Sequence, residues 1–271
     1  MAVRRRLVRV ALSLDDALAG RVPALGAVEQ AEGLLVTSLP VAALADLPPA
    51  GRLVHIRQRY ARHWIDLAAG EAAWRAALSA DLRRRLRRKD QRLRATGAEV
   101  RRYATPAEIA AFHPLARAVS ARTYQERLLD AGLPADPAPL LALAAADRVR
   151  AWLLVLDGAP IAYLCCTADG ATLRYDHVGH DPVAASRSPG TVLLATALAD
   201  LFGEGRWDRF DFTEGDGRHK RQLATGGVEC VDLLLLGPTA ANRALLAAMR
   251  GFDAMVAWAK RRVPRLRRLG R

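Results

Sequence analysis

Apolar and polar residues follow two different periods along this chain, and these periods predict a β-rich beginning and a mixed α/β body. Short apolar runs bounded by turn residues predict strands over residues 3–10, 33–40 and 52–56. Over residues 71–94 the apolar positions recur at helical spacing instead, which predicts one amphipathic helix. The residues of its apolar stripe are Trp74, Leu78, Leu82, Leu86 and Leu93.

A regular series of elements follows this helix. A strand over 99–103 precedes a helix that begins with the capping box Thr105-x-x-Glu108, with Pro106 at its first position. The later elements are a short Ala/Leu helix after the Pro-containing segment 132–139, strands over 149–156, 159–167 and 172–179, a helix over 191–202, strands over 209–213 and 228–236, and a helix over 239–262. This order predicts an α/β (α+β) fold, in which a mixed sheet has helices on both faces.

The positive charge of the chain is concentrated in two short segments. The net charge is +13, and residues 83–94 hold eight basic residues and one acid, while residues 260–271 hold seven basic residues and no acid. Each segment has the charge to bind nucleotide phosphates, an anionic membrane surface or RNA. Neither contains the interleaved aromatic residues of a base-stacking platform, and we expect no DNA partner.

Composition and cysteine spacing exclude several classes of protein. Apolar residues make up 51% of the chain, which supports a sizeable core and excludes general disorder. No apolar run is long enough to span a bilayer, and no signal-peptide segment follows Met1. We therefore expect a cytoplasmic protein, with peripheral binding at the inner membrane left open. Cys165, Cys166 and Cys230 lack metal-site spacing, so we expect neither zinc nor disulfides.

The densest cluster of candidate chemistry lies in residues 171–224, where strand, polar loop and helix occur twice in succession. The loop Arg187-Ser188-Pro189-Gly190 opens the first of these helices. A Gly-containing loop at a helix start leaves backbone amides and the positive end of the helix dipole facing an anion. The second strand ends in Glu214-Gly215-Asp216, and strand ends are where open α/β sheets bind ligands.

Several motifs of this region resemble those of the GNAT acyltransferases, in particular the CelD-like and BioF2-like branch, which is related to the FemAB aminoacyltransferases. The matching motifs are the arginine-rich helix 82–88, the segment 175–182 (YDHVGHDP), the turn 188–194 (SPGTVLL), and the segment 210–216 (FDFTEGD) followed by Lys220-Arg221. The likeness runs from about residue 74 to residue 236. It implies a GNAT-like, mostly antiparallel mixed sheet in residues 71–237, a small β-rich lobe in 1–70, and a basic amphipathic helix and tail in 238–271.

The resemblance also implies a donor site for acyl-CoA and needs no metal. The loop residues that would hold the CoA pyrophosphate are Arg187, Ser188, Gly190, Thr191 and Val192. GNAT proteins usually have a small residue at the position of Val192, so this chain departs from the family pattern there.

Amide formation from a thioester requires a base, an oxyanion donor and an acid for the leaving thiolate. His177 is the best single base candidate, since the ordinary pKa of histidine lies near neutrality. A simple strand count places Tyr175 and His177 on one face and Asp176 on the other, but a bulge would break that parity, so the choice between Asp176 and His177 stays open. The further candidates are Asp216 and Glu214 for deprotonating the amine, Tyr175 for protonating the thiolate, and Lys220 and Tyr124 for binding the acceptor.

The first hypothesis is an acyl-CoA-dependent N-acyltransferase that works by direct attack in a ternary complex. Its acceptor would be an amino sugar or exopolysaccharide precursor, or a lipid-borne amine. Two alternatives stay open: an aminoacyl-tRNA-dependent transferase of the FemAB type, and a non-catalytic RNA- or membrane-binding adaptor on the same scaffold.

Overall fold

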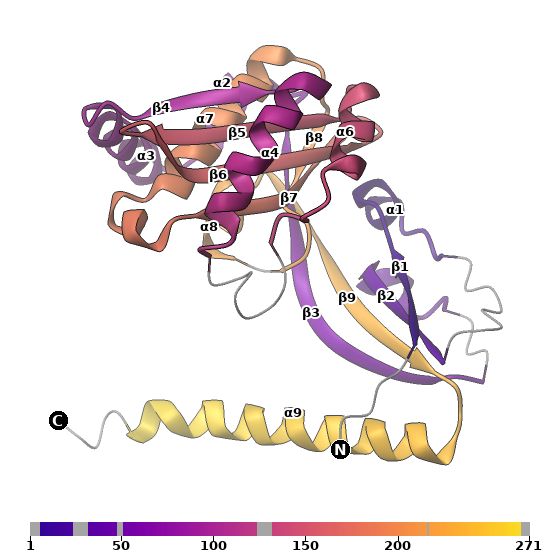
Figure 1. Cartoon of the computed structure of the whole chain (residues 1–271). Helices are drawn as coiled ribbons and strands as arrows, with labels where there is room; N and C mark the ends of the chain where they lie inside the picture. The colour runs from indigo at the N-terminus through magenta and orange to yellow at the C-terminus, as the bar shows by residue number, and fades with distance from the viewer. Residues whose placement is uncertain (1–5, 24–31, 48–50, 124–131, 216, 267–271) are drawn as a thin grey trace. The chain divides into compact units, whose positions relative to one another are not determined.

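Our computed structural model describes residues 6–23, 32–47, 51–123, 132–215 and 217–266, and it divides the chain into two units. One unit comprises residues 1–60 and 229–271, and the other comprises residues 61–228. Strands β3 (Leu53–Asp66) and β9 (Gly226–Leu236) contribute residues to both (Figure 1). The predicted division into domains at residues 70 and 237 remains a prediction.

The first unit is rich in β-strands. Its β1 (Leu7–Ala11) pairs in parallel with β2 (Gly33–Pro40), and β2 pairs antiparallel with β9. The other elements of this unit are α1 (Leu14–Leu18), η1 (Val41–Leu44) and α9 (Ala240–Leu266). Strand β2 has the predicted limits, whereas β3 extends ten residues beyond the predicted end at residue 56 because its polar middle hides the strand period. Among the described residues, no helix combines the length and apolar character that crossing a bilayer requires.

The second unit contains the mixed sheet. Its strands follow the order β3, β8, β7, β6, β5 and β4. The pair β7–β8 is parallel, and the pairs β3–β8, β6–β7, β5–β6 and β4–β5 are antiparallel. The bounds of the strands not yet introduced are β4 Glu99–Tyr103, β5 Val149–Leu156, β6 Ala159–Asp169, β7 Thr172–His180 and β8 Arg209–Asp211. The predicted GNAT-like, mostly antiparallel sheet is therefore confirmed.

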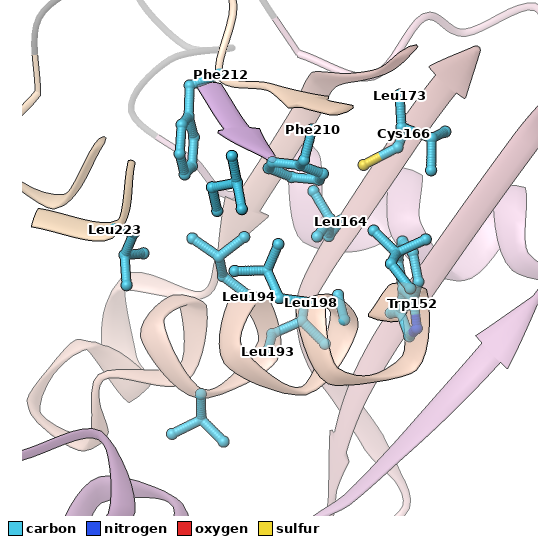
Figure 2. Packing of buried hydrophobic residues seen from close by; sticks show 14 of the residues in the cluster. Trp152, Leu164, Cys166, Leu173, Leu193, Leu194, Leu198, Phe210, Phe212 and Leu223 are labelled. Atoms are coloured by element: carbon cyan, nitrogen blue, oxygen red, sulfur yellow. The ribbon is translucent and has the colours of Figure 1, made fainter. Parts of the chain in front are cut away.

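Helices cover both faces of this sheet, as predicted, and they divide the side chains of the central strands between two cores (Figure 1). The bounds of these helices are α2 Gly70–Ala77, α3 Ala80–Arg94, α4 Pro106–Ser120, α6 Ala138–Ala145, η2 Pro182–Arg187, α7 Pro189–Glu204 and α8 Arg218–Leu223. Trp152, Leu164 and Cys166 belong to the same core as the leucines of α7, as Figure 2 shows. Their sequence neighbours Leu153 and Cys165 pack instead with α4 on the other face. All residues of β5 are buried because both faces are covered.

The single helix predicted over residues 71–94 is wrong, because two helices occupy this stretch. Leu78 has an extended backbone and ends α2, and the side chain of Ser79 accepts a hydrogen bond from the Leu82 amide as the N-cap of α3. Trp74 and Leu93 are nevertheless buried as the predicted apolar stripe requires, since the break changes the helix axis without exposing the stripe.

Candidate active site

The site lies where two parallel strands part. Strand β7 pairs with β8 only from Thr172 to Arg174. Beyond Arg174, β7 continues to His180 along β6, while the chain leaves β8 at Asp211. The free edge of β7 therefore faces the segment that connects β8 to α8, and an opening lies between two strands that share one sheet.

A cavity of about 590 Å³ occupies this opening. Its walls come from the second half of β7, η2, the first turns of α7, α8, and Thr123, three residues after the end of α4. The lining residues are Thr123, Tyr175, Val178, Gly179, His180, Pro182, Ala185, Gly190, Thr191, Leu194, His219 and Leu223. The walls are mostly apolar, and a few side chains capable of proton transfer or hydrogen bonding project into them, which is the usual composition of a small-molecule site.

A β-bulge decides which residues of β7 reach this cavity. Cys165 pairs with His177 and Cys166 pairs with Tyr175, so Asp176 is the extra residue of the bulge. Tyr175 consequently lies on the α7 face of the sheet with Cys166, and His177 lies on the opposite face with Cys165. The expectation from simple strand parity that Tyr175 and His177 share a face is therefore wrong.

Tyr175 lines the cavity in a hydrophobic environment. Its ring packs edge-on against Phe210 and Phe212, at centroid distances of 5.8 Å in both cases. Burial raises the pKa of Tyr175 well above its ordinary range, so the phenol is protonated at neutral pH. A buried, protonated phenol beside a cavity can donate a hydrogen bond or a proton to a leaving group.

His177 and Asp176 do not line the cavity. Burial lowers the pKa of His177, whose ring hydrogen-bonds the backbone of Gly132. Asp176 accepts a hydrogen bond from Thr167 and forms an ion pair with Arg174 at 2.9 Å. Their catalytic roles remain predictions, and their partners lie on the α4 face of the sheet.

The turn that opens α7 offers fewer backbone donors than predicted. Ser188 adopts a left-handed conformation with φ of 55°, and its carbonyl accepts hydrogen bonds from the amides of Thr191 and Val192 at 3.1 and 3.3 Å. Pro189 has no amide hydrogen. In the part of the chain that the structure describes, the Gly190 amide has no hydrogen-bond acceptor. One backbone donor is therefore available here, rather than a series of them, because the turn satisfies the others internally.

The other predicted donor-loop residues differ in position. Gly190 and Thr191 line the cavity, and His180 Nδ1 lies beside Gly190, 3.9 Å from the position of an added Cβ. Arg187 is exposed and does not line the cavity, and Ser188 does not line it either. Val192 is buried in the core that α7 shares with β5 and β6, so its side chain points away from the turn.

Of the residues predicted to act on the acceptor, Glu214 lies in the turn after β8 and Lys220 lies in α8. The ammonium of Lys220 donates hydrogen bonds to the carbonyls of Phe212 and Glu214 at 2.7 and 2.6 Å, and Thr213 within this turn has φ of 59°. Lys220 thus holds the chain where it leaves β8. Asp216 and Tyr124 lie outside the described residues.

A second cavity of about 470 Å³ adjoins the first, since Thr191, His219 and Leu223 line both. Its cationic lining residues are Arg85 and Lys89 from α3 and Arg218 from α8. Arg85 forms an ion pair with Asp81 at 2.6 Å, whereas among the described residues Lys89 and Arg218 have no ion-pair partner. The sequence marked α3 as basic, but only its packing beside α7 and α8 joins these charges to the opening at β7.

His219 is the titratable residue that the sequence analysis missed. It lines both cavities and packs edge-on against Phe212 at a centroid distance of 6.3 Å. Burial, and then the charge of Lys220, lower the pKa of His219, so the imidazole is neutral at pH 7. The available signal was its position directly before Lys220, which the motif had already singled out. No group of three His, Cys, Asp or Glu residues suited to a metal ion occurs within the described ranges.

Comparisons with known proteins identify the family and the fold. A family model described as an acetyltransferase (GNAT) domain matches residues 80–221, more than half of the chain. The chain resembles the C-terminal domain of a protein described as a lysylphosphatidylglycerol synthetase from Agrobacterium fabrum, with 14% identity and a TM-score of 0.55 over 83% of this chain and 72% of that chain. It also resembles L-PGS from Bacillus licheniformis, with 12% identity and a TM-score of 0.50 over 79% of this chain and 71% of that chain. A structure of FemX is 12% identical, with a TM-score of 0.48 over 76% of this chain and 72% of the FemX chain. No curated protein has a matching sequence.

Proposed function

Because the chain belongs to the family of acetyltransferase (GNAT) domains, as its motifs predicted, we propose that it transfers an acyl group from acyl-CoA to an amine by direct attack in a ternary complex. The observation that supports this proposal best is the cavity at the parting of β7 and β8, into which a neutral imidazole and a protonated phenol both project. A CoA thioester donor would support the expected location in the cytoplasm.

The two titratable groups suit the two proton transfers of the reaction. The neutral His219 removes a proton from the acceptor ammonium, and the amine nitrogen then attacks the thioester carbonyl carbon. The new C–N bond gives an intermediate with an oxyanion and a positively charged nitrogen. This nitrogen loses its second proton to solvent, and collapse of the oxyanion breaks the C–S bond. Tyr175 gives its proton to the departing thiolate and regains a proton through the solvent from the protonated His219. The Gly190 amide, which lies in the cavity wall and has no acceptor among the described residues, can donate a hydrogen bond to this oxyanion.

The second cavity supplies the charge that the α7 turn lacks. Phosphate groups of a CoA donor would meet Arg85, Lys89 and Arg218, while its thioester end enters the larger cavity past the shared Thr191. In this proposal the donor phosphates are attracted mainly by cations of α3 and α8, and not by Arg187, the residue predicted from the motif.

The apolar walls at Val178, Pro182 and Leu194 favour an acyl chain or an acceptor with apolar parts. An amine on a lipid fits these walls better than a free amino sugar or an exopolysaccharide precursor, whose hydroxyl groups need hydrogen-bond partners. The acceptor is thus proposed to be a lipid-borne or otherwise partly apolar amine.

One observation favours a second donor class. Arg87, Arg88 and Arg92 are exposed on α3 and, among the described residues, have no ion-pair partners, so α3 presents more positive charge than one CoA molecule requires. An aminoacyl-tRNA donor would use this additional charge.

Binding measurements separate these readings. The expected result is that acetyl-CoA binds in calorimetry and raises the melting temperature. Lys89→Ala and Arg218→Ala should each weaken the binding of acetyl-CoA about tenfold, since each variant loses about one charge-assisted hydrogen bond to phosphate. The affinity for pantetheine, which has no phosphate, should be unchanged.

Arg84→Ala and Arg88→Ala are matched controls, because both residues lie on α3 but line a different cavity. If the wild-type chain binds no CoA thioester and retains aminoacyl-tRNA with a steep dependence on salt, the acyl-CoA proposal is wrong. If CoA binds equally to all four variants, the assignment of the phosphate cavity is wrong and the transferase proposal stands.

A further inference from the structure

The C-terminal helix α9 changes its surroundings halfway along its length. In its first half, Leu246 is buried against β9 and Met249 packs beside it. In its second half, Phe252, Met255 and Trp258 are exposed to 61%, 55% and 54%. The helix therefore continues beyond the surface on which it packs, and its large apolar side chains continue with it.

These exposed side chains form one patch rather than scattered residues. Phe252, Met255 and Trp258 follow one another at intervals of three, and residues three apart are neighbours on a helix surface. Single exposed apolar residues are ordinary, but a contiguous apolar patch marks a surface that contacts another apolar phase.

The charge around the patch indicates which phase that is. Asp253 is the one acidic residue of α9, and it lies 3.7 Å from His55 Nε2. The sequence from residue 260 to residue 271 contains seven basic residues and no acid. An aromatic and methionine face that runs into a basic segment is the composition of a helix that lies in a membrane interface.

We propose that the second half of α9 docks on the surface of an anionic lipid bilayer. Phe252, Met255 and Trp258 enter the boundary between headgroups and acyl chains, and the positive charge of the sequence 260–271 favours anionic over neutral lipid. A second copy of the chain is a poorer occupant, because each copy would bring seven like charges to the contact. RNA would satisfy the charge but would leave most of the apolar patch in water.

The test is flotation of the full chain with phosphatidylcholine vesicles, with and without phosphatidylglycerol. The chain should float only with the anionic vesicles, and high salt should weaken its binding. The fluorescence of Trp258 should shift to the blue on binding, because it is the one exposed tryptophan: Trp74, Trp152 and Trp207 are buried and Trp64 is half-buried. Phe252→Ser/Met255→Ser/Trp258→Ser, and separately a chain that ends at Ala259, should each bind at least about tenfold more weakly.

The matched control is Leu18→Ser/Leu115→Ser/Val183→Ser, which removes three exposed apolar side chains from other elements. It should bind vesicles like the wild type. Three results would each overturn the proposal. The triple α9 variant could float as well as the wild type, or the wild type could float equally well with vesicles that contain no phosphatidylglycerol. The third result is concentration-dependent self-association of the wild type that the α9 substitutions abolish. Circular dichroism should be unchanged in both substitution variants, since the substituted side chains are exposed, and the chain that ends at Ala259 should lose only the signal of the helical residues it lacks.

Discussion

The buried ion pair between Arg62 and Asp211 gives the sharpest stability prediction. Arg62 of β3 is 3% exposed and Asp211 at the end of β8 is 0% exposed. Their guanidinium and carboxylate form two hydrogen bonds, of 3.2 and 2.5 Å, and Asp211 also accepts the Thr213 amide at 2.8 Å. The pair therefore holds the end of β8 at the point where β7 departs, so we expect Arg62→Met to destabilise the site together with the fold.

The magnitude follows from what remains after each substitution. Arg62→Met leaves the Asp211 carboxylate buried with one backbone donor, and an uncompensated buried charge costs about 3–5 kcal/mol. Arg62→Met/Asp211→Leu removes both charges and leaves the Thr213 amide without its acceptor, which costs about 1–3 kcal/mol. The double variant should therefore be more stable than the single variant by about 2 kcal/mol.

Urea unfolding measures both differences, and Arg101→Met is the matched control. Arg101 also belongs to a strand and also pairs with a carboxylate, Glu99, at 2.6 Å, but both side chains are about half exposed. Such a surface pair contributes about 0–1 kcal/mol. If Arg62→Met costs no more than Arg101→Met, then burial does not decide the strength of these pairs and the argument fails.

Three further predictions concern packing and pH. Gly179→Ala should lower the free energy of unfolding by about 1–3 kcal/mol, because an added Cβ would lie 2.5 Å from Tyr163 Cε1, whereas Gly203→Ala on open helix surface should raise it by about 0.5–1 kcal/mol. The value of kcat/KM should fall as pH drops through the lowered pKa of His219. His219→Ala should abolish this acid-side dependence of kcat/KM on pH together with most of the activity. Burial lowers the pKa of His177, so as the pH falls the imidazole is protonated in the unfolded chain before it is protonated in the folded chain. The free energy of unfolding should therefore decline from about pH 6.5 downward. His177→Gln should flatten this decline in urea unfolding at a series of pH values, and an unchanged slope would contradict it.

Much of the fold was predictable because its signals are local. The capping box of Thr105 and Glu108 forms as its spacing predicted, and its hydrogen bonds join residues three apart. The limits of β2 and β5 were also correct, since a run of buried residues between turns identifies a strand without reference to its partners. The break at Leu78 and Ser79 was missed, because the apolar stripe continues across it and Ser79 was the only local signal.

The candidate site was predictable only in part, and its errors have one physical cause. The sequence alone predicted a candidate site in residues 171–224, and Tyr175, Gly190 and Thr191 from that prediction line the cavity. Only tertiary pairing decided that a bulge at Asp176 turns His177 to the other face. Tertiary contacts also brought together Arg62 and Asp211, which are 149 residues apart in the sequence. They likewise brought the cations of α3 to the opening, through the packing of α3 beside α7. Periodicity and capping depend on neighbours along the chain, whereas strand register and the meeting of distant charges depend on contacts that no local pattern encodes.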